Sequence, residues 1–260
     1  MKRHRMSRSR DRATAAVLVL LTGCTAPPPP AAAPLPTAVA TSSARYTADV
    51  PPVTPSGAAV EALVRLPVAP WASGAGYSRD AFGDRWTDDI DVGGGHNGCD
   101  QRSDILRRDL DDVVLKRNTQ GCVPATGTLH DPYTGATIPF VRGAATSADI
   151  QIDHVVALSN AWRTGGQRLT AQQRQDFAGD PLGLLAVDGA SNQSKGDDDA
   201  AAWLPPRTPF HCAYVARQIA VKTTYRLWVT PDEAASMAAT LADCPGEPLP
   251  ADSDVPAPVR

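Results

Sequence analysis

The sequence has few aromatic residues and no long apolar run. Phenylalanine, tyrosine and tryptophan together make up 5% of the 260 residues, whereas hydrophobic residues as a whole make up 42%. No uninterrupted apolar stretch reaches the ~18 residues that a membrane-spanning helix requires, which excludes a multi-pass membrane protein. The hydrophobic content and the length are sufficient for one sizeable folded domain or two small ones.

Positive charge is also scarce outside the first residues. The net charge is −3, but residues 1–23 carry six basic side chains against one acidic, so the remaining chain carries −8. This balance excludes a histone-like protein that holds nucleic acid by bulk charge.

The N-terminal residues have the pattern of a secretory signal. A basic stretch, residues 1–12, precedes a short apolar stretch, residues 13–21, which is too short for a transmembrane anchor. The sequence Leu-Thr-Gly-Cys that ends at Cys24 resembles the bacterial lipobox, in which the cysteine is lipidated and becomes the first mature residue. The resemblance implies a lipoprotein signal peptide over residues 1–23 and a lipid anchor on Cys24. A plain signal peptide with a chance cysteine, or an unrelated basic tail, are the alternatives.

Proline marks the two segments that flank the folded part. Nine of the 24 prolines lie between positions 27 and 55, which indicates an extended tether over residues 24–56. Residues 245–260 contain five more and are expected to form a flexible tail. The folded domain is therefore expected to span residues 57–244.

Cysteines are few, and their number is informative. Apart from Cys24 the chain has four, an even number in an oxidising compartment, which favours disulfides. Three pairings are open to four cysteines; the most economical one joins Cys99 to Cys122 and Cys212 to Cys244. A zinc site is the alternative, but no Cys-x-x-Cys or Cys/His spacing supports it.

The hydrophobic pattern predicts an α+β domain with a small antiparallel sheet. A strand that begins at position 150 is expected to end on Asp153 and His154, and an apolar run occupies residues 182–187. Two Thr-x-x-Gln/Glu sequences, at Thr170 and Thr230, predict helix starts. We further expect a hairpin over residues 129–141, a helix over 155–162, a short helix over 197–203 and a helix that opens near Pro209.

Two short motifs point to chemistry. Asp153-His154-Val155-Val156 follows the predicted strand, and about 38 residues after His154 comes Asn192-Gln-Ser-Lys195-Gly-Asp. The order of these parts resembles the HNH nuclease superfamily, whose site is a ββα-metal finger. More closely, residues 77–244 resemble secreted bacterial proteins with an HNH domain like the C-terminal part of the GmrSD restriction enzymes.

The resemblance implies a role for each motif residue. His154 is expected to be the general base, since an imidazole titrates near neutral pH. Asp153 and Asn192 are expected to be metal ligands, because carboxylate and amide oxygens suit Mg²⁺, with Mn²⁺ as the alternative ion. Lys195 is expected to contact a phosphate of the substrate.

One departure from the motif of the HNH superfamily concerns its middle residue. An Asn there braces the loop that holds the base, but this chain has Gly183 at the corresponding place. The brace must therefore come from elsewhere, or activity is reduced. Because the mature chain is acidic, a local basic cleft is also needed, and Arg163, Arg168, Arg174 and Lys195 are the residues we expect to line it.

The sequence thus favours a metal-dependent endonuclease acting on DNA, or on nucleic acid without strong sequence preference. We expect a monomer outside the cytoplasm, lipid-anchored to the membrane or secreted. One alternative is an HNH-fold binding lipoprotein with impaired catalysis, which Gly183 favours. Another is a cell-wall hydrolase, for which no Gly-x-Ser-x-Gly or His-Glu-x-x-His motif is present.

Overall fold

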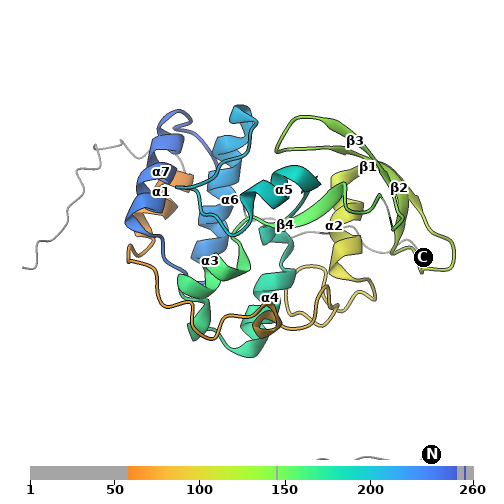
Figure 1. Ribbon diagram of the computed structural model, residues 1–260, viewed down its shortest axis with the longest axis horizontal. Coiled ribbons are helices and arrows are strands. Elements are labelled where there is room, and N and C mark those ends of the chain that lie inside the picture. The colour runs from red at the N-terminus through yellow and green to blue at the C-terminus, as the bar shows by residue number, and fades with distance from the viewer. Residues whose placement is uncertain (1–57, 145, 251–254, 256–260) are drawn as a thin grey trace, which may run out of the picture. The chain divides into compact units, whose positions relative to one another are not determined.

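Two small antiparallel sheets and seven α-helices make up the part of the chain that the structure describes (Figure 1). The structure is a computed structural model that describes residues 58–144, 146–250 and 255. This architecture confirms the predicted α+β class. The predicted signal peptide, Cys24 and the predicted tether lie outside the described residues, as does most of residues 251–260. None of the described helices has the length and apolar character needed to cross a membrane.

Strands β1 to β4 follow one another in the chain, and β5 comes after two further helices. The helices are α1 (Ala58–Arg65), α2 (Gln101–Asp109), α3 (Leu158–Arg163), α4 (Ala171–Gly179), α5 (Gly189–Lys195), α6 (His211–Thr224) and α7 (Pro231–Ala242). The strands are β1 (Leu110–Leu115), β2 (Pro124–His130), β3 (Thr137–Val141), β4 (Ile150–His154) and β5 (Leu184–Asp188). Single 3₁₀ turns are η1 (Arg79–Phe82), η2 (Gly166–Arg168), η3 (Pro181–Gly183) and η4 (Thr208–Phe210).

Local side-chain chemistry fixes two of the helix starts as predicted. Thr170 accepts a hydrogen bond from the backbone N–H of Gln173, whose side chain accepts one from the backbone of Thr170. The same reciprocal pair forms between Thr230 and Glu233 at the start of α7. Each pair satisfies two N–H groups that a helix start leaves without an intrahelical partner.

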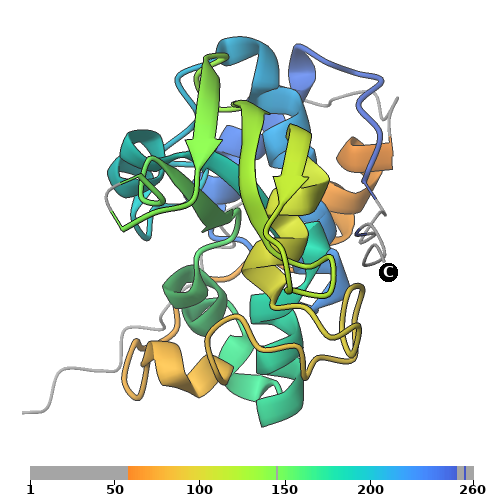
Figure 2. The same ribbon diagram turned by 90° about the vertical axis from the view of Figure 1, so that its right-hand side faces the viewer.

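The larger sheet has the strand order β1-β2-β3, and both pairings are antiparallel. Its β2–β3 connection is the predicted hairpin. The Asp131 carboxylate accepts from the backbone N–H of Thr134, and Gly135 takes a φ of 78°, which only glycine adopts at low cost. The three strands lie side by side with α2 against one face of the sheet (Figure 2).

The smaller sheet pairs β4 with β5, with Ile150 opposite Asp188 and His154 opposite Leu184. Helices α3 and α4 lie between these strands in the chain, and α5 begins directly after β5. The chain therefore has the strand-strand-helix order expected of a ββα finger, with a helical insertion between the strands.

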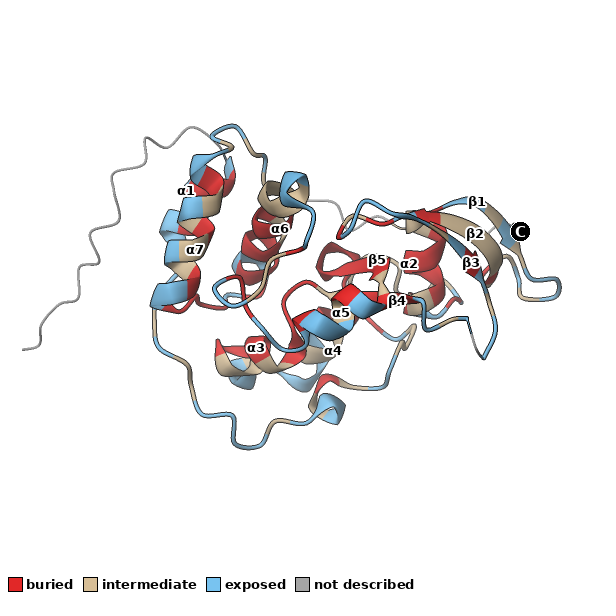
Figure 3. Ribbon diagram, turned by 45° about the horizontal axis from the view of Figure 1, so that its top comes forward, coloured by how far each residue is buried: buried red, intermediate tan, exposed pale blue. Residues whose placement is uncertain are grey.

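Strand β5 separates two hydrophobic cores. Leu184 and Ala186 pack with α2 and the larger sheet, whereas Leu185 and Val187 pack with the helical cluster of α1, α3, α6 and α7. Alternate residues of a strand point to opposite faces, so β5 is buried on both sides. Figure 3 shows this strand between the buried faces of α6 and α2. Packing on both faces of β5 therefore fixes the position of the β4–β5 pair, which carries Asp153 and His154.

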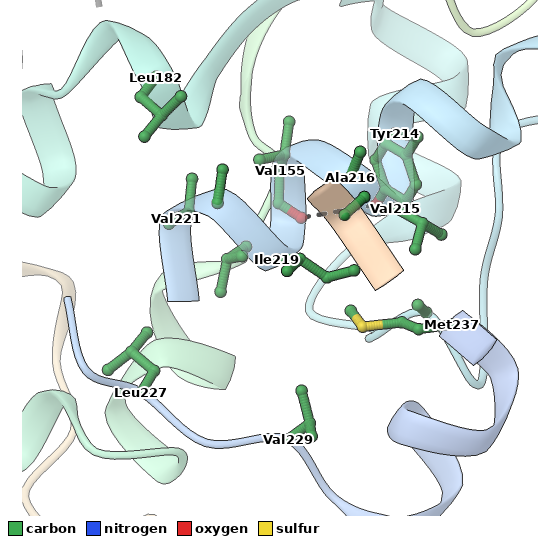
Figure 4. Close-up of a cluster of buried hydrophobic side chains, with 14 of the residues drawn as sticks. Val155, Leu182, Tyr214, Val215, Ala216, Ile219, Val221, Leu227, Val229 and Met237 are labelled. Atoms are coloured by element: carbon green, nitrogen blue, oxygen red, sulfur yellow. Dashed lines mark hydrogen bonds between the residues drawn. The ribbon is translucent and has the colours of Figure 1, made fainter. Parts of the chain in front are cut away.

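Helix α6 is the centre of the larger core. Its residues 214–216 and 218–222 are all buried. Tyr214, Val215 and Ile219 point from it toward neighbouring elements in the close-up (Figure 4). The ammonium group of Lys222, fully buried, is neutralised by Glu233 of α7 at 2.8 Å. This ion pair joins the last turn of α6 to the first turn of α7.

The predicted helix over residues 197–203 is wrong, because the helix forms earlier in the chain. Asp188 accepts from the backbone N–H of Ser191 and so caps α5 at its start. Gly196, with a φ of 53°, ends the helix. Residues 197–203 form turns instead. The predicted helix over residues 155–162 begins later, at Leu158.

Two disulfides are present, Cys99–Cys122 and Cys212–Cys244, which are the pairs that the sequence analysis favours. The first ties the residue before the N-cap of α2 to the segment that leads into β2. The second joins the first turn of α6 to the segment after α7.

With Cys24 left aside as the expected lipidation site, we expect protein isolated from an oxidising compartment to contain no free thiol. Peptide mapping under non-reducing conditions should recover the two pairs named above. Replacing Cys212 and Cys244 together by alanine should lower the free energy of unfolding by ~2–5 kcal/mol, measured by urea denaturation. Four reactive thiols in such a preparation would contradict the pairing.

Candidate active site

The four motif residues line one cleft of about 290 Å³. Asp153 and His154 are the last two residues of β4, and Asn192 and Lys195 lie one turn apart on α5. The fold therefore brings together two motifs that are separated in the chain by the α3–α4 insertion. Arg79 of η1 and Asp197 line the same cleft.

The His154 imidazole is held by a backbone carbonyl. Its Nε2 lies 2.9 Å from the carbonyl oxygen of Ala178, at the end of α4. Since a carbonyl only accepts, Nε2 carries the proton in this hydrogen bond, and Nδ1 keeps its lone pair. The indole of Trp86 stacks on the imidazole, with ring centroids 6.0 Å apart and planes 16° from parallel. Both contacts limit rotation of the ring.

Burial lowers the pKa of His154 from 6.5 to about 4. The largest cause is desolvation, which disfavours the protonated imidazole. The positive charges of Arg79 and Lys195 also lower the pKa. The hydrogen bond to Ala178 and the charge of Asp153 oppose this shift. The imidazole is therefore neutral near pH 7, the form that a general base requires.

Asp153 is almost fully buried, with 4% of its surface exposed. One carboxylate oxygen accepts a hydrogen bond from the Lys195 ammonium at 2.8 Å, and the other accepts from the Tyr133 hydroxyl. Each carboxylate oxygen has a second lone pair, so these two contacts leave acceptor capacity. The carboxylate can hold a cation in the cleft without losing its partners.

Lys195 lies inside the protein. It is 1% exposed, and its ammonium donates to Asp153 and, at 2.9 Å, to the backbone carbonyl of His154. A substrate phosphate would have to displace these contacts, so the position does not favour the expected phosphate contact. The geometry favours a positioning role, in which Lys195 fixes the carboxylate of Asp153 and the end of β4.

Asn192 completes the pair of oxygen donors. Its amide nitrogen donates to the Gln151 side-chain oxygen at 2.9 Å, which leaves the amide oxygen for another partner. One carboxylate and one amide oxygen in a cleft open to water suit Mg²⁺, which keeps several of its own waters. These residues therefore fit the expected ion. Among the described residues, a group of three metal-ligating types within reach of one ion is formed by Cys212, Cys244 and Glu247, but its two sulfurs are joined in the disulfide.

Comparisons with known proteins agree with this arrangement. Residues 100–240 match the family model described as GmrSD restriction endonucleases, C-terminal domain. The chain belongs to this family. It is also similar to a protein of Arthroderma benhamiae described as an uncharacterized secreted protein, with 37% identity over 197 residues that cover 75% of this chain and 89% of the relative. No solved structure matches the chain.

Within this GmrSD C-terminal domain, backbone groups hold the segment around Gly183, the position at which the sequence lacks the expected Asn. The carbonyl of Gly183 accepts from the Val155 N–H at 2.9 Å, and that of Ala178 holds His154. The intervening loop is fixed by Asp180, which accepts from the Leu182 N–H and from the Tyr225 hydroxyl. The position of His154 is thus fixed by contacts that do not require a side chain at position 183.

The arginines near His154 are not those expected from the sequence. Arg163 stacks on Trp71, Arg168 on Trp228, and Arg174 donates to the carbonyls of Ala81 and Leu169. Arg79 and Arg85, both N-terminal to the matched residues, line the cavities that meet at His154. No sequence signal marks them, because they reach the site only through the tertiary fold.

We expect the His154 ring to titrate near pH 4 in metal-free protein, measured by NMR in EDTA with His154→Gln as the assignment control. An unfolded chain binds this proton near pH 6.5, so stability should fall as the pH drops from about 6.5 to about 4. The loss should amount to roughly 3 kcal/mol and be absent in His154→Gln. A ring that titrates above pH 6 would contradict a neutral, partly desolvated imidazole.

Proposed function

We propose that the protein is a divalent-metal-dependent endonuclease that hydrolyses phosphodiester bonds of DNA outside the cytoplasm. The observation that carries this proposal is the single cleft in which a neutral, braced imidazole lies beside a carboxylate and an amide oxygen. Membership of a family described by its restriction endonucleases supports a nucleic acid as the substrate.

His154 is proposed as the general base. Its Nδ1 takes a proton from water as the water oxygen bonds to phosphorus and the bond to the 3′ oxygen breaks. The Ala178 carbonyl holds the opposite nitrogen and stabilises the imidazolium that forms. The Arg79 guanidinium, in the same cleft, is placed to contact a phosphoryl oxygen.

Asp153 and Asn192 are proposed to hold the metal ion, Mg²⁺ or Mn²⁺. When bound, such an ion neutralises negative charge on the phosphoryl oxygens and on the departing oxygen. Lys195 and Tyr133 orient Asp153 for this role through the two hydrogen bonds described above.

The proposed place of action is the cell surface. The signal pattern and Cys24 support export with a lipid anchor, and the secreted fungal relative supports export in general. We propose that the folded domain acts there as a monomer, tethered by residues 24–56.

Plasmid cleavage tests the activity. The purified protein should convert supercoiled plasmid to open forms with Mg²⁺ or Mn²⁺ and not with EDTA. His154→Ala should lower the rate by ~10²–10⁴-fold, the usual loss on removing a general base. His130→Ala is the matched control, since His130 is an exposed histidine outside the cleft. Cleavage by His154→Ala at the wild-type rate would remove His154 from the mechanism.

Metal titration separates the ligands from the base. Asp153→Asn and Asn192→Ala should need more Mg²⁺ or Mn²⁺ for half-maximal cleavage, and excess metal should restore part of the rate by mass action. His154→Ala should not be restored. Asn is chosen at position 153 because its amide oxygen can still accept a hydrogen bond from Lys195; since it removes the negative charge that pairs with this buried ammonium, thermal denaturation should confirm that the variant folds. Identical metal curves for wild type and Asp153→Asn would show that Asp153 is not a ligand.

A further inference from the structure

A second cavity, of about 360 Å³, lies next to the cleft of the motif residues. Arg79, His154 and Leu158 line both, so the two spaces meet at the proposed base. The rest of its wall comes largely from η1 and residues 83–87, which precede the matched residues 100–240. Nothing in the proposed hydrolysis uses this cavity.

Trp86 forms the aromatic wall of the cavity. Its indole is half-buried and packs partly against the core of α2 and the larger sheet. Its backbone has a φ of 59°, a left-handed conformation that is costly for a bulky residue. The Gln101 N–H donates to its carbonyl and holds it there. A strained aromatic residue beside a catalytic candidate is an arrangement typical of ligand-binding positions.

The charges around the cavity cancel. Arg79 and Arg85 face it together with Asp80 and Asp84. An anionic group alone would meet as many carboxylates as guanidinium groups. A neutral planar ring with donors and acceptors on its edge would find an aromatic face and both kinds of hydrogen-bond partner, including the amide of Gln175.

We propose that this cavity binds one unpaired nucleobase of the substrate strand, next to the phosphate that is cut. A base inside a duplex has both faces covered by its neighbours, so only an unstacked base can enter a pocket and stack on Trp86. The Arg85 side chain, exposed and 5.8 Å from the indole centroid, covers the ring loosely and is displaced by the base. The substrate class is therefore single-stranded nucleic acid or a duplex with an unpaired nucleotide. This inference rests on the proposed function.

Binding in EDTA tests the inference without cleavage. Fluorescence anisotropy with a labelled single-stranded oligonucleotide and a duplex of the same sequence should show tighter binding of the single strand. Trp86→Ala should weaken single-strand binding by about 5- to 100-fold, the range expected for loss of one stacked base. Trp86→Phe should keep most of it. Trp71→Ala, which removes a half-buried tryptophan outside the cavity, is the matched control and should bind like wild type.

A spectroscopic measurement covers the case in which Trp86→Ala does not fold. Oligo(dT) should quench part of the tryptophan fluorescence of the wild-type protein, and that part should be missing in Trp86→Phe. Equal binding of the single strand by wild type and Trp86→Ala would overturn the proposed nucleobase pocket. Equal quenching in wild type and Trp86→Phe would overturn it as well.

The cleavage rates separate two further outcomes. Trp86→Ala should raise KM for a single-stranded substrate more than it lowers kcat. A lower kcat with unchanged binding would make Trp86 a positioning residue for His154 and overturn the inference. Selective single-strand binding without any cleavage would keep the inference and remove the proposed function. Metal-dependent cleavage that does not depend on Trp86 would keep the proposed function and overturn the inference.

Discussion

The buried ion pair between Asp153 and Lys195 is the contact on which the site depends. It joins the end of β4 to the last turn of α5. The hydroxyl of Tyr133, in the β2–β3 connection, donates to the same carboxylate and so links the hairpin to the ion pair. Both side chains are almost removed from water, so losing one partner would leave the other as an isolated buried charge. Lys195 also holds the carbonyl of His154. The ion pair thereby fixes the position of α5 relative to the end of β4 and to His154.

The surrounding fold keeps that spacing constant. Strand β5, which pairs with β4, packs into a separate core on each of its faces, so the strand pair cannot tilt toward either side without losing packing. Two backbone carbonyls orient His154: that of Ala178 contacts the imidazole, and that of Gly183 accepts from the N–H of Val155, the next residue. The orientation of His154 therefore does not depend on a side chain at position 183.

Features that depend on neighbouring residues in the chain could be predicted from the sequence. The two capping boxes, the β2–β3 turn and the strand that ends on His154 all follow from local hydrogen bonding or alternation. The short helix predicted over residues 197–203 forms instead over residues 189–195, because Asp188 caps its start. The run of carboxylates after Gly196 does not start a helix. The burial of Lys195 and the positions of Arg79 and Trp86 depend on contacts distant in the chain, which no spacing in the sequence encodes.

The family match begins at residue 100, whereas the cavity wall that holds Trp86 and Arg85 comes earlier in the chain. Arg85 and Trp86 therefore precede the stretch of sequence that carries the Asp153–His154 and Asn192–Lys195 motifs. If the proposed nucleobase pocket holds, substitutions at Arg85 or Trp86 would alter which nucleic acid strands are accepted while the Asp153–His154 and Asn192–Lys195 motifs stay unchanged.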